Sequence, residues 1–262
     1  MRDFHDIPVV ILAGGLGTRI ATDGENRPKP MLDIGDRPII WHIMKYYSSF
    51  GAREFILCLG HRGNIIRDYF LNYHTRNVSL SLDIADAKVK LHDSNESEDW
   101  KITLVDTGRE SLTGERLKKV EKFVNNRIFA MTYGDGLGDV NLASLLKFHG
   151  THNGLATLTA VHPTSRFGLV TADDDGKVLD FSEKPVTQDW INGGFFILEP
   201  QIFSYIQGNE AWESGPLSRI ATQGSLYAFR HTGFWKPIDT QRELAEMNAI
   251  WISGKAPWKN WQ

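Results

Sequence analysis

The chain has 262 residues, of which 41% are hydrophobic and 23% charged, so its composition is that of a globular protein with a sizeable core. Its formal net charge of −3 argues against a general nucleic-acid-binding function, which usually shows a basic excess. The single cysteine, Cys58, excludes an internal disulfide, and no apolar run approaches the roughly 20 residues that span a membrane. We therefore expect a cytoplasmic protein with no nucleic-acid or membrane partner.

Short apolar runs alternate with helical patterns along most of the chain. The β-branched run at 8–14 predicts a strand buried on both faces, and the apolar stripe at 37–51 predicts a helix that ends at Gly51. Further strands are expected at 54–60, 101–108, 127–136, 155–161, 192–200 and 225–231, with helices at 64–73, 114–124, 141–153, 217–224 and 241–254. Such alternation predicts an α/β fold with a Rossmann-like mixed, mostly parallel sheet flanked by helices.

Two segments do not follow this alternation. Residues 77–101 alternate apolar and polar residues and then become acidic, which predicts an exposed hairpin followed by a surface loop, as an insertion for subunit contact or a lid. Residues 167–185 predict two strands around a turn at 173–176, where Asp-Gly is a strong hairpin signal. This second segment begins a small β-rich part.

A glycine-rich loop follows the first strand directly. In "AGGLGTR", Gly14, Gly15 and Gly17 carry no Cβ, so their backbone N–H groups can approach a phosphate closely, and Arg19 can bind phosphate oxygens with two hydrogen bonds. The loop has neither the Gly-Lys-Ser/Thr of ATPases nor a Gly-x-Gly-x-x-Gly pattern. Taken alone, it also fits a plain tight turn.

Lys29 lies between Pro28 and Pro30 in "RPKP". The prolines restrict the backbone before any ligand binds, which suits a lysine that stabilises charge on a phosphoryl group. The alternative is an exposed loop lysine.

These two motifs, followed in order by "YGDG", "EKP" and "INGGFF", resemble the signature of the sugar nucleotidyltransferases. The resemblance covers nearly the whole chain, and "TLVDTG", "GFWKPIDT" and "GKAPWKNW" resemble the branch that uses cytidine nucleotides. It implies one nucleotidyltransferase domain over 1–262, with a nucleotide-binding part at about 1–150 and a sugar-phosphate-binding part at about 151–262. It also implies CTP and glucose 1-phosphate as substrates, Mg²⁺ as cofactor and a homo-oligomer.

The resemblance assigns catalytic roles to Arg19 and Lys29, which would neutralise the triphosphate. Asp135, between glycines at a strand exit, and Asp239 would hold Mg²⁺, a hard cation that prefers oxygen ligands. Locally, Asp135 also fits an Asx turn and Asp239 a helix cap. The nucleotide would be bound by Leu12, Ala13, Gly14, Gly15, Leu16, Gly17, Thr18, Ser111, Thr113, Arg116 and Gly134.

Ser111, Thr113 and Arg116 would read the cytosine edge, although Arg116 also fits the first turn of a basic helix. This chain has Glu115 where the family pattern has glycine, which adds a side chain to the loop.

The sugar phosphate would be bound by Gly168, Glu183, Lys184, Asn192, Gly193 and Trp235. Locally, Glu183 and Lys184 also fit a surface pair, and Trp235 a core residue.

Three functions remain open from the sequence. The first is cytidylyl transfer to glucose 1-phosphate, and the second is the same chemistry with another sugar phosphate or pyrimidine nucleotide. The third is a nucleotide-sugar-binding protein without turnover. The two motifs and the two aspartates favour transfer, because these groups are useful mainly for that reaction.

Overall fold

The computed structural model describes residues 4–15, 27–76, 78–92, 98–165 and 167–261. It is built around one central sheet. Within these residues, seven strands pair in the order β14-β10-β13-β8-β1-β4-β7. Their bounds are β1 (Val9–Leu12), β4 (Glu54–Leu59), β7 (Lys101–Asp106), β8 (Phe129–Tyr133), β10 (Ala156–Val161), β13 (Ile191–Leu198) and β14 (Leu226–His231). Only β13 among them runs antiparallel to its neighbours. The predicted mixed, mostly parallel sheet is confirmed.

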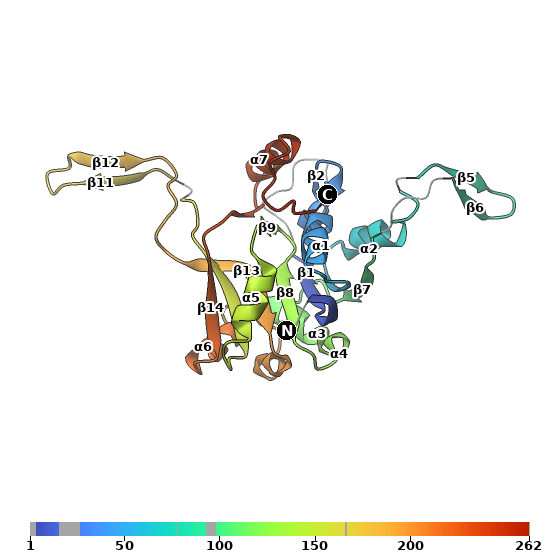
Figure 1. Cartoon of the computed structure of the whole chain (residues 1–262), viewed down its shortest axis with the longest axis horizontal. Coiled ribbons are helices and arrows are strands. Elements are labelled where there is room, and N and C mark those ends of the chain that lie inside the picture. Colours follow the sequence, from blue (N-terminus) through green and yellow to red (C-terminus); the bar gives the residue numbers. More distant parts are fainter. Residues whose placement is uncertain (1–3, 16–26, 77, 93–97, 166, 262) are drawn as a thin grey trace.

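Helices cover both faces of this sheet (Figure 1). One face packs against α1 (Ile39–Ser49), α2 (Gly63–Leu71), α5 (Leu142–His149) and α7 (Gln241–Ile252). The other packs against α3 (Thr113–Lys119), α4 (Glu121–Val124), η3 (Pro200–Tyr205) and α6 (Pro216–Thr222). In β1, Val9 and Ile11 join the first core cluster, whereas Val10 and Leu12 join the second. Burial on both faces explains why this strand is continuously apolar.

Short helical turns and two-stranded antiparallel pairs complete the structure around the central sheet. The turn η2 (Lys29–Met31) precedes β2 (Asp33–Ile34) and β3 (Arg37–Pro38), and η1 (Phe4–Asp6) precedes β1. Strand β9 (Gly136–Gly138) pairs with β15 (Trp235–Pro237), and the Ile238 N–H donates to the Asp135 carbonyl at 2.8 Å. This ribbon brings Asp135 and Asp239 together although they are about a hundred positions apart.

Two hairpins project from opposite ends of the body (Figure 1). They are β5 (Leu80–Asp83) with β6 (Lys88–Leu91), and β11 (Leu169–Ala172) with β12 (Val178–Ser182). Both confirm the hairpins predicted from the sequence, and Gly176 takes the positive φ of 82° at the predicted turn. Leu82 and Phe181 are each 60% exposed, because nothing in the described chain covers the hairpin faces. Among the described residues, no helix has the length and apolarity needed to cross a membrane.

Tryptophan side chains from α1, α7 and the residues after α7 surround the buried His42 of α1. Its ring lies against the rings of Trp41, Trp251, Trp258 and Trp261. His42 Nε2 lies 2.9 Å from the Ile34 carbonyl, to which it donates, and Nδ1 accepts from the Trp258 indole at 3.4 Å. Both bonds suit the neutral ring, and burial lowers the pKa of His42 from 6.5 to about 4.

The unfolded chain therefore takes up a proton at His42 near pH 6.5, whereas the folded chain does so only near pH 4. Stability from this group is complete above pH 6.5 and is lost as the pH falls, by roughly 2–3 kcal/mol between pH 7 and pH 4.5. We expect urea unfolding of His42→Gln to show a smaller loss over that range. The control is His74→Gln, because His74 is exposed. If wild type and His42→Gln lost the same free energy of unfolding between pH 7 and pH 4.5, the assignment of this pH dependence to His42 would be contradicted.

Candidate active site

Lys29 places its ammonium between two carboxylates at the carboxyl edge of the sheet. Its Nζ contacts Asp239 Oδ1 and lies 3.4 Å from Asp135 Oδ2. Asp135 follows β8, Asp239 follows β15, and Lys29 opens η2 after Pro28 in an extended conformation (φ −70°, ψ 148°). Burial raises the pKa of Asp135, and Asp239 adds to the rise, while Lys29 opposes both. One cation thus offsets the repulsion between two carboxylates.

A cavity of about 480 Å³ opens beside this cluster. Its lining includes the following predicted site residues: Leu12, Ala13, Gly14, Gly15, Lys29, Ser111, Thr113, Arg116, Gly134 and Asp135. A Cβ on Gly134 would lie 3.1 Å from the Leu12 carbonyl oxygen, so a larger residue would crowd the place where the two strand exits meet. Leu16, Gly17, Thr18 and Arg19 lie outside the described residues. The cavity therefore gathers the described part of the predicted nucleotide-binding set.

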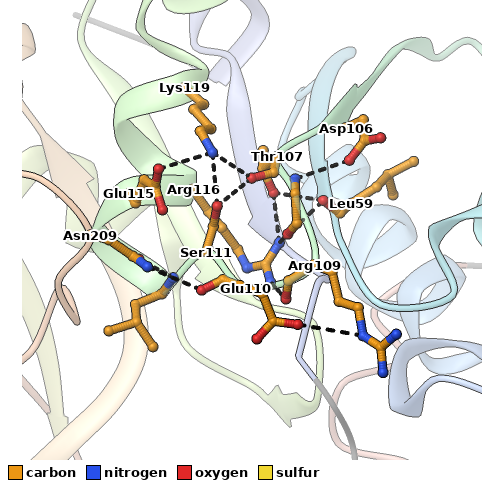
Figure 2. A network of polar contacts seen from close by, with 12 residues as sticks. Leu59, Asp106, Thr107, Arg109, Glu110, Ser111, Glu115, Arg116, Lys119 and Asn209 are labelled. Atoms are coloured by element: carbon orange, nitrogen blue, oxygen red, sulfur yellow. Dashed lines mark hydrogen bonds and ion pairs between the residues drawn. The ribbon is translucent and has the colours of Figure 1, made fainter.

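Arg116 lies at the centre of a polar network beside the cavity (Figure 2). Only 5% of the residue is exposed. Nη1 donates to Thr107 Oγ1 at 2.7 Å and to the carbonyls of Gly108 and Leu59, and Nη2 donates to the carbonyls of Gly14 and Arg109. The guanidinium ties the glycine loop to the loop after β7. Its predicted role in reading a base stays a prediction.

The two predicted base-reading hydroxyls also hold local structure. Ser111 Oγ donates to the Thr107 carbonyl at 2.5 Å and accepts from Lys119 Nζ at 2.8 Å (Figure 2). Thr113 Oγ1 donates to Glu213 Oε2 at 2.9 Å and accepts from the Trp212 N–H. Their base-reading role stays a prediction.

Glu115, the residue that departs from the family pattern, pairs with Lys119 at 3.0 Å and also interacts with Ser111 of the loop (Figure 2). Its hydrogen bond with Lys119 lowers the pKa of Glu115. The close approach falls instead at Gly114, where a Cβ would lie 2.7 Å from the Glu210 carbonyl oxygen.

Tyr133 and Glu213 line the cavity but were not predicted. The Tyr133 hydroxyl donates to Glu213 Oε1 at 2.5 Å, and Asn192 Nδ2 lies 3.4 Å from that hydroxyl. Burial raises the pKa of Tyr133, so the phenol stays protonated and can donate. The position of Tyr133 just before Gly134 at a strand exit could have indicated it, whereas no sequence pattern marks Glu213.

The predicted sugar-phosphate residues fall into two groups. Asn192 and Gly193 lie on β13 and Trp235 on β15; the Trp235 indole donates to the Gly193 carbonyl at 2.7 Å. Gly168, Glu183 and Lys184 flank the β11–β12 hairpin, which stands away from the body in Figure 1. Glu183 and Lys184 lie 3.6 Å apart, and the Glu183 side chain is 62% exposed. All six predicted sugar-phosphate residues are described, and none of them lines the cavity.

The fold and this cluster define a nucleotidyltransferase. A family model for nucleotidyl transferases matches residues 8–249, and the chain belongs to that family. The chain is 44% identical over 256 residues to the glucose-1-phosphate cytidylyltransferase of Salmonella typhi, a match that covers 97% of this chain and 99% of that protein.

Two solved structures share the fold. The first is UDP-glucose pyrophosphorylase complexed with UDP-glucose, with a TM-score of 0.66 and 17% identity over 95% of this chain and 99% of that chain. The second is HddC from Yersinia pseudotuberculosis complexed with GMP-PN, with a TM-score of 0.66 and 21% identity over 94% and 99%.

Replacing the Arg116 fork tests its positioning role. Arg116→Lys keeps the charge but cannot reach the Gly14 and Gly108 carbonyls together, so buried acceptors lose their partners. We expect urea unfolding to show a loss of about 2–4 kcal/mol. Arg109→Lys is the control, because its side chain is 69% exposed and should change stability by less than about 0.5 kcal/mol. If Arg116→Lys and Arg109→Lys lowered the free energy of unfolding equally, the role of Arg116 in holding the two loops together would be contradicted.

Proposed function

We propose that this chain transfers a cytidylyl group from CTP to α-D-glucose 1-phosphate, giving CDP-glucose and pyrophosphate. The observation that carries the proposal is the 44% identity, over nearly the full length of both chains, to a glucose-1-phosphate cytidylyltransferase. The cavity beside Lys29, Asp135 and Asp239 supports it, because a divalent cation held by the two carboxylates, together with the lysine, would neutralise phosphate charge there.

The reaction is an in-line displacement. An oxygen of the sugar phosphate forms a bond to the α-phosphorus of CTP, and the bond from that phosphorus to the bridging oxygen of pyrophosphate breaks. No covalent enzyme intermediate is needed, because positioning and charge neutralisation can carry phosphoryl transfer. The buried Cys58, whose pKa burial raises to about 12, is not a nucleophile.

The site residues then have the following proposed roles. Gly14 and Gly15 would present backbone to the triphosphate, and Lys29 would neutralise charge at the α-phosphate; Arg19 remains proposed for the triphosphate. Asp135 and Asp239 fit a divalent cation, since both already direct carboxylate oxygens at one cationic group. When bound, Mg²⁺ would neutralise triphosphate charge. Glu183, Lys184 and Asn192 remain proposed for the sugar phosphate.

We also propose a homo-oligomer in which the hairpins contact another copy of the chain. Leu80 pairs with Leu91 and Leu82 with Val89 across β5 and β6, which places four apolar side chains on one uncovered face. A two-stranded hairpin with such a face is marginal alone in water. Analytical ultracentrifugation should show more than one chain per particle, and a strict monomer would refute this.

Pyrophosphate release tests the reaction directly. With Mg²⁺ and α-D-glucose 1-phosphate, we expect release with CTP and little with UTP, dTTP, ATP or GTP. Asp135→Asn should reduce the rate by about two orders of magnitude or more and leave the melting temperature near that of wild type. The control is Asp33→Asn, which removes a surface carboxylate paired with Arg27.

Pyrophosphate release with a different nucleotide would show that the proposed base is wrong. Release only with another sugar phosphate would show that the proposed acceptor is wrong. If no combination gave release, a nucleotide-sugar-binding protein without turnover would be the better description.

A further inference from the structure

The ammonium of Lys29 occupies the position where the two carboxylates converge. It contacts Asp239 and Asp135 at once, and its side chain is only 15% exposed. The two carboxylates lie at the same end of the β9–β15 ribbon, on strands that are far apart in the sequence, so only the folded chain brings them together. Without a cation between them, their charges would repel each other in a partly buried site.

A divalent cation would need the same oxygens. Among the described residues, no group of three or more His, Cys, Asp or Glu side chains could hold a metal ion. Two carboxylates with phosphate oxygens and waters are a normal environment for Mg²⁺. A metal that serves the cavity would therefore compete with Lys29 for Asp135 and Asp239.

The lysine is the partner able to move. Asp239 is held by its backbone N–H, which donates to Glu243 Oε2 at 2.8 Å, and Glu243 also completes the capping box of α7 with Thr240. Asp135 is fixed between β8 and β9, through the bond from Ile238 to its carbonyl. Lys29 has a backbone restricted by prolines but a long, rotatable side chain.

We propose that Lys29 is an exchangeable internal counterion for the metal site. Its ammonium holds the two carboxylates together when no metal is present, leaves when a divalent cation binds, and is then available to a phosphate group. The last step rests on the proposed function, whereas the exchange does not. Lys29 thereby makes metal binding to the nucleotide-free protein weak, and a phosphate that attracts the ammonium favours metal binding.

Mn²⁺ binding to the nucleotide-free protein tests the exchange without any turnover. In Lys29→Met, which removes the charge and keeps an unbranched side chain, we expect isothermal titration to show Mn²⁺ binding about tenfold tighter than in wild type, or more. Lys45→Met is the matched control, because it removes one lysine from a part-buried pair with Glu98. Its Mn²⁺ affinity should stay within about twofold of wild type.

A third variant locates the metal. Adding Asp239→Asn to Lys29→Met should abolish the gain in affinity if the metal binds between the two carboxylates. The proposal is overturned if Lys29→Met binds Mn²⁺ no more tightly than wild type, or if Lys45→Met gains as much. Melting curves establish that each variant folds, and Lys29→Gln replaces Lys29→Met if that variant does not.

The outcomes separate this proposal from the reaction. Tighter Mn²⁺ binding by Lys29→Met, together with no pyrophosphate release by wild type, would retain the exchange and reject the proposed activity. Release by wild type without any gain in Lys29→Met would do the reverse.

Discussion

The contact of Lys29 with Asp135 and Asp239 is the constraint on which the site depends. Three separate pieces of chain meet there: a proline-bounded turn, the exit of β8 and the exit of β15. The central strands are short and apolar, and they end together, so polar groups gather at one edge. The β9–β15 ribbon carries the second carboxylate to that edge. The fold thus places two carboxylates close together and supplies one cation that offsets part of their negative charge.

Arg116 is a second buried cation with a different set of partners. Lys29 meets carboxylates and can exchange with another cation, whereas Arg116 meets backbone carbonyls and a hydroxyl, which only a forked donor satisfies together. The ion pairs of Lys29 suit a cation that can move to a ligand. The hydrogen bonds of Arg116 suit a fixed arrangement of the loops. Both residues line the cavity: Lys29 lies beside the two carboxylates, and Arg116 holds the loops that border the cavity.

The sequence predicted the sheet well because burial on both faces leaves a local pattern, as in the apolar run of β1. It could not predict that Asp135 and Asp239 meet, since that depends on the pairing of β9 with β15; only the family resemblance joined them. The hydrogen-bond network of Arg116 could not be predicted from the sequence, because its acceptors are mostly backbone carbonyls, which every residue carries. Glu213 was missed for a similar reason: it lies in an irregular segment and reaches the cavity only in the folded chain.

The most direct test of this account is anomalous diffraction at the manganese edge from crystals grown with CTP and Mn²⁺. We predict one anomalous peak between Asp135 and Asp239, with the Lys29 ammonium displaced from both carboxylates and turned toward a phosphate oxygen. A peak elsewhere, or Lys29 still between the two aspartates beside a bound nucleotide, would contradict it.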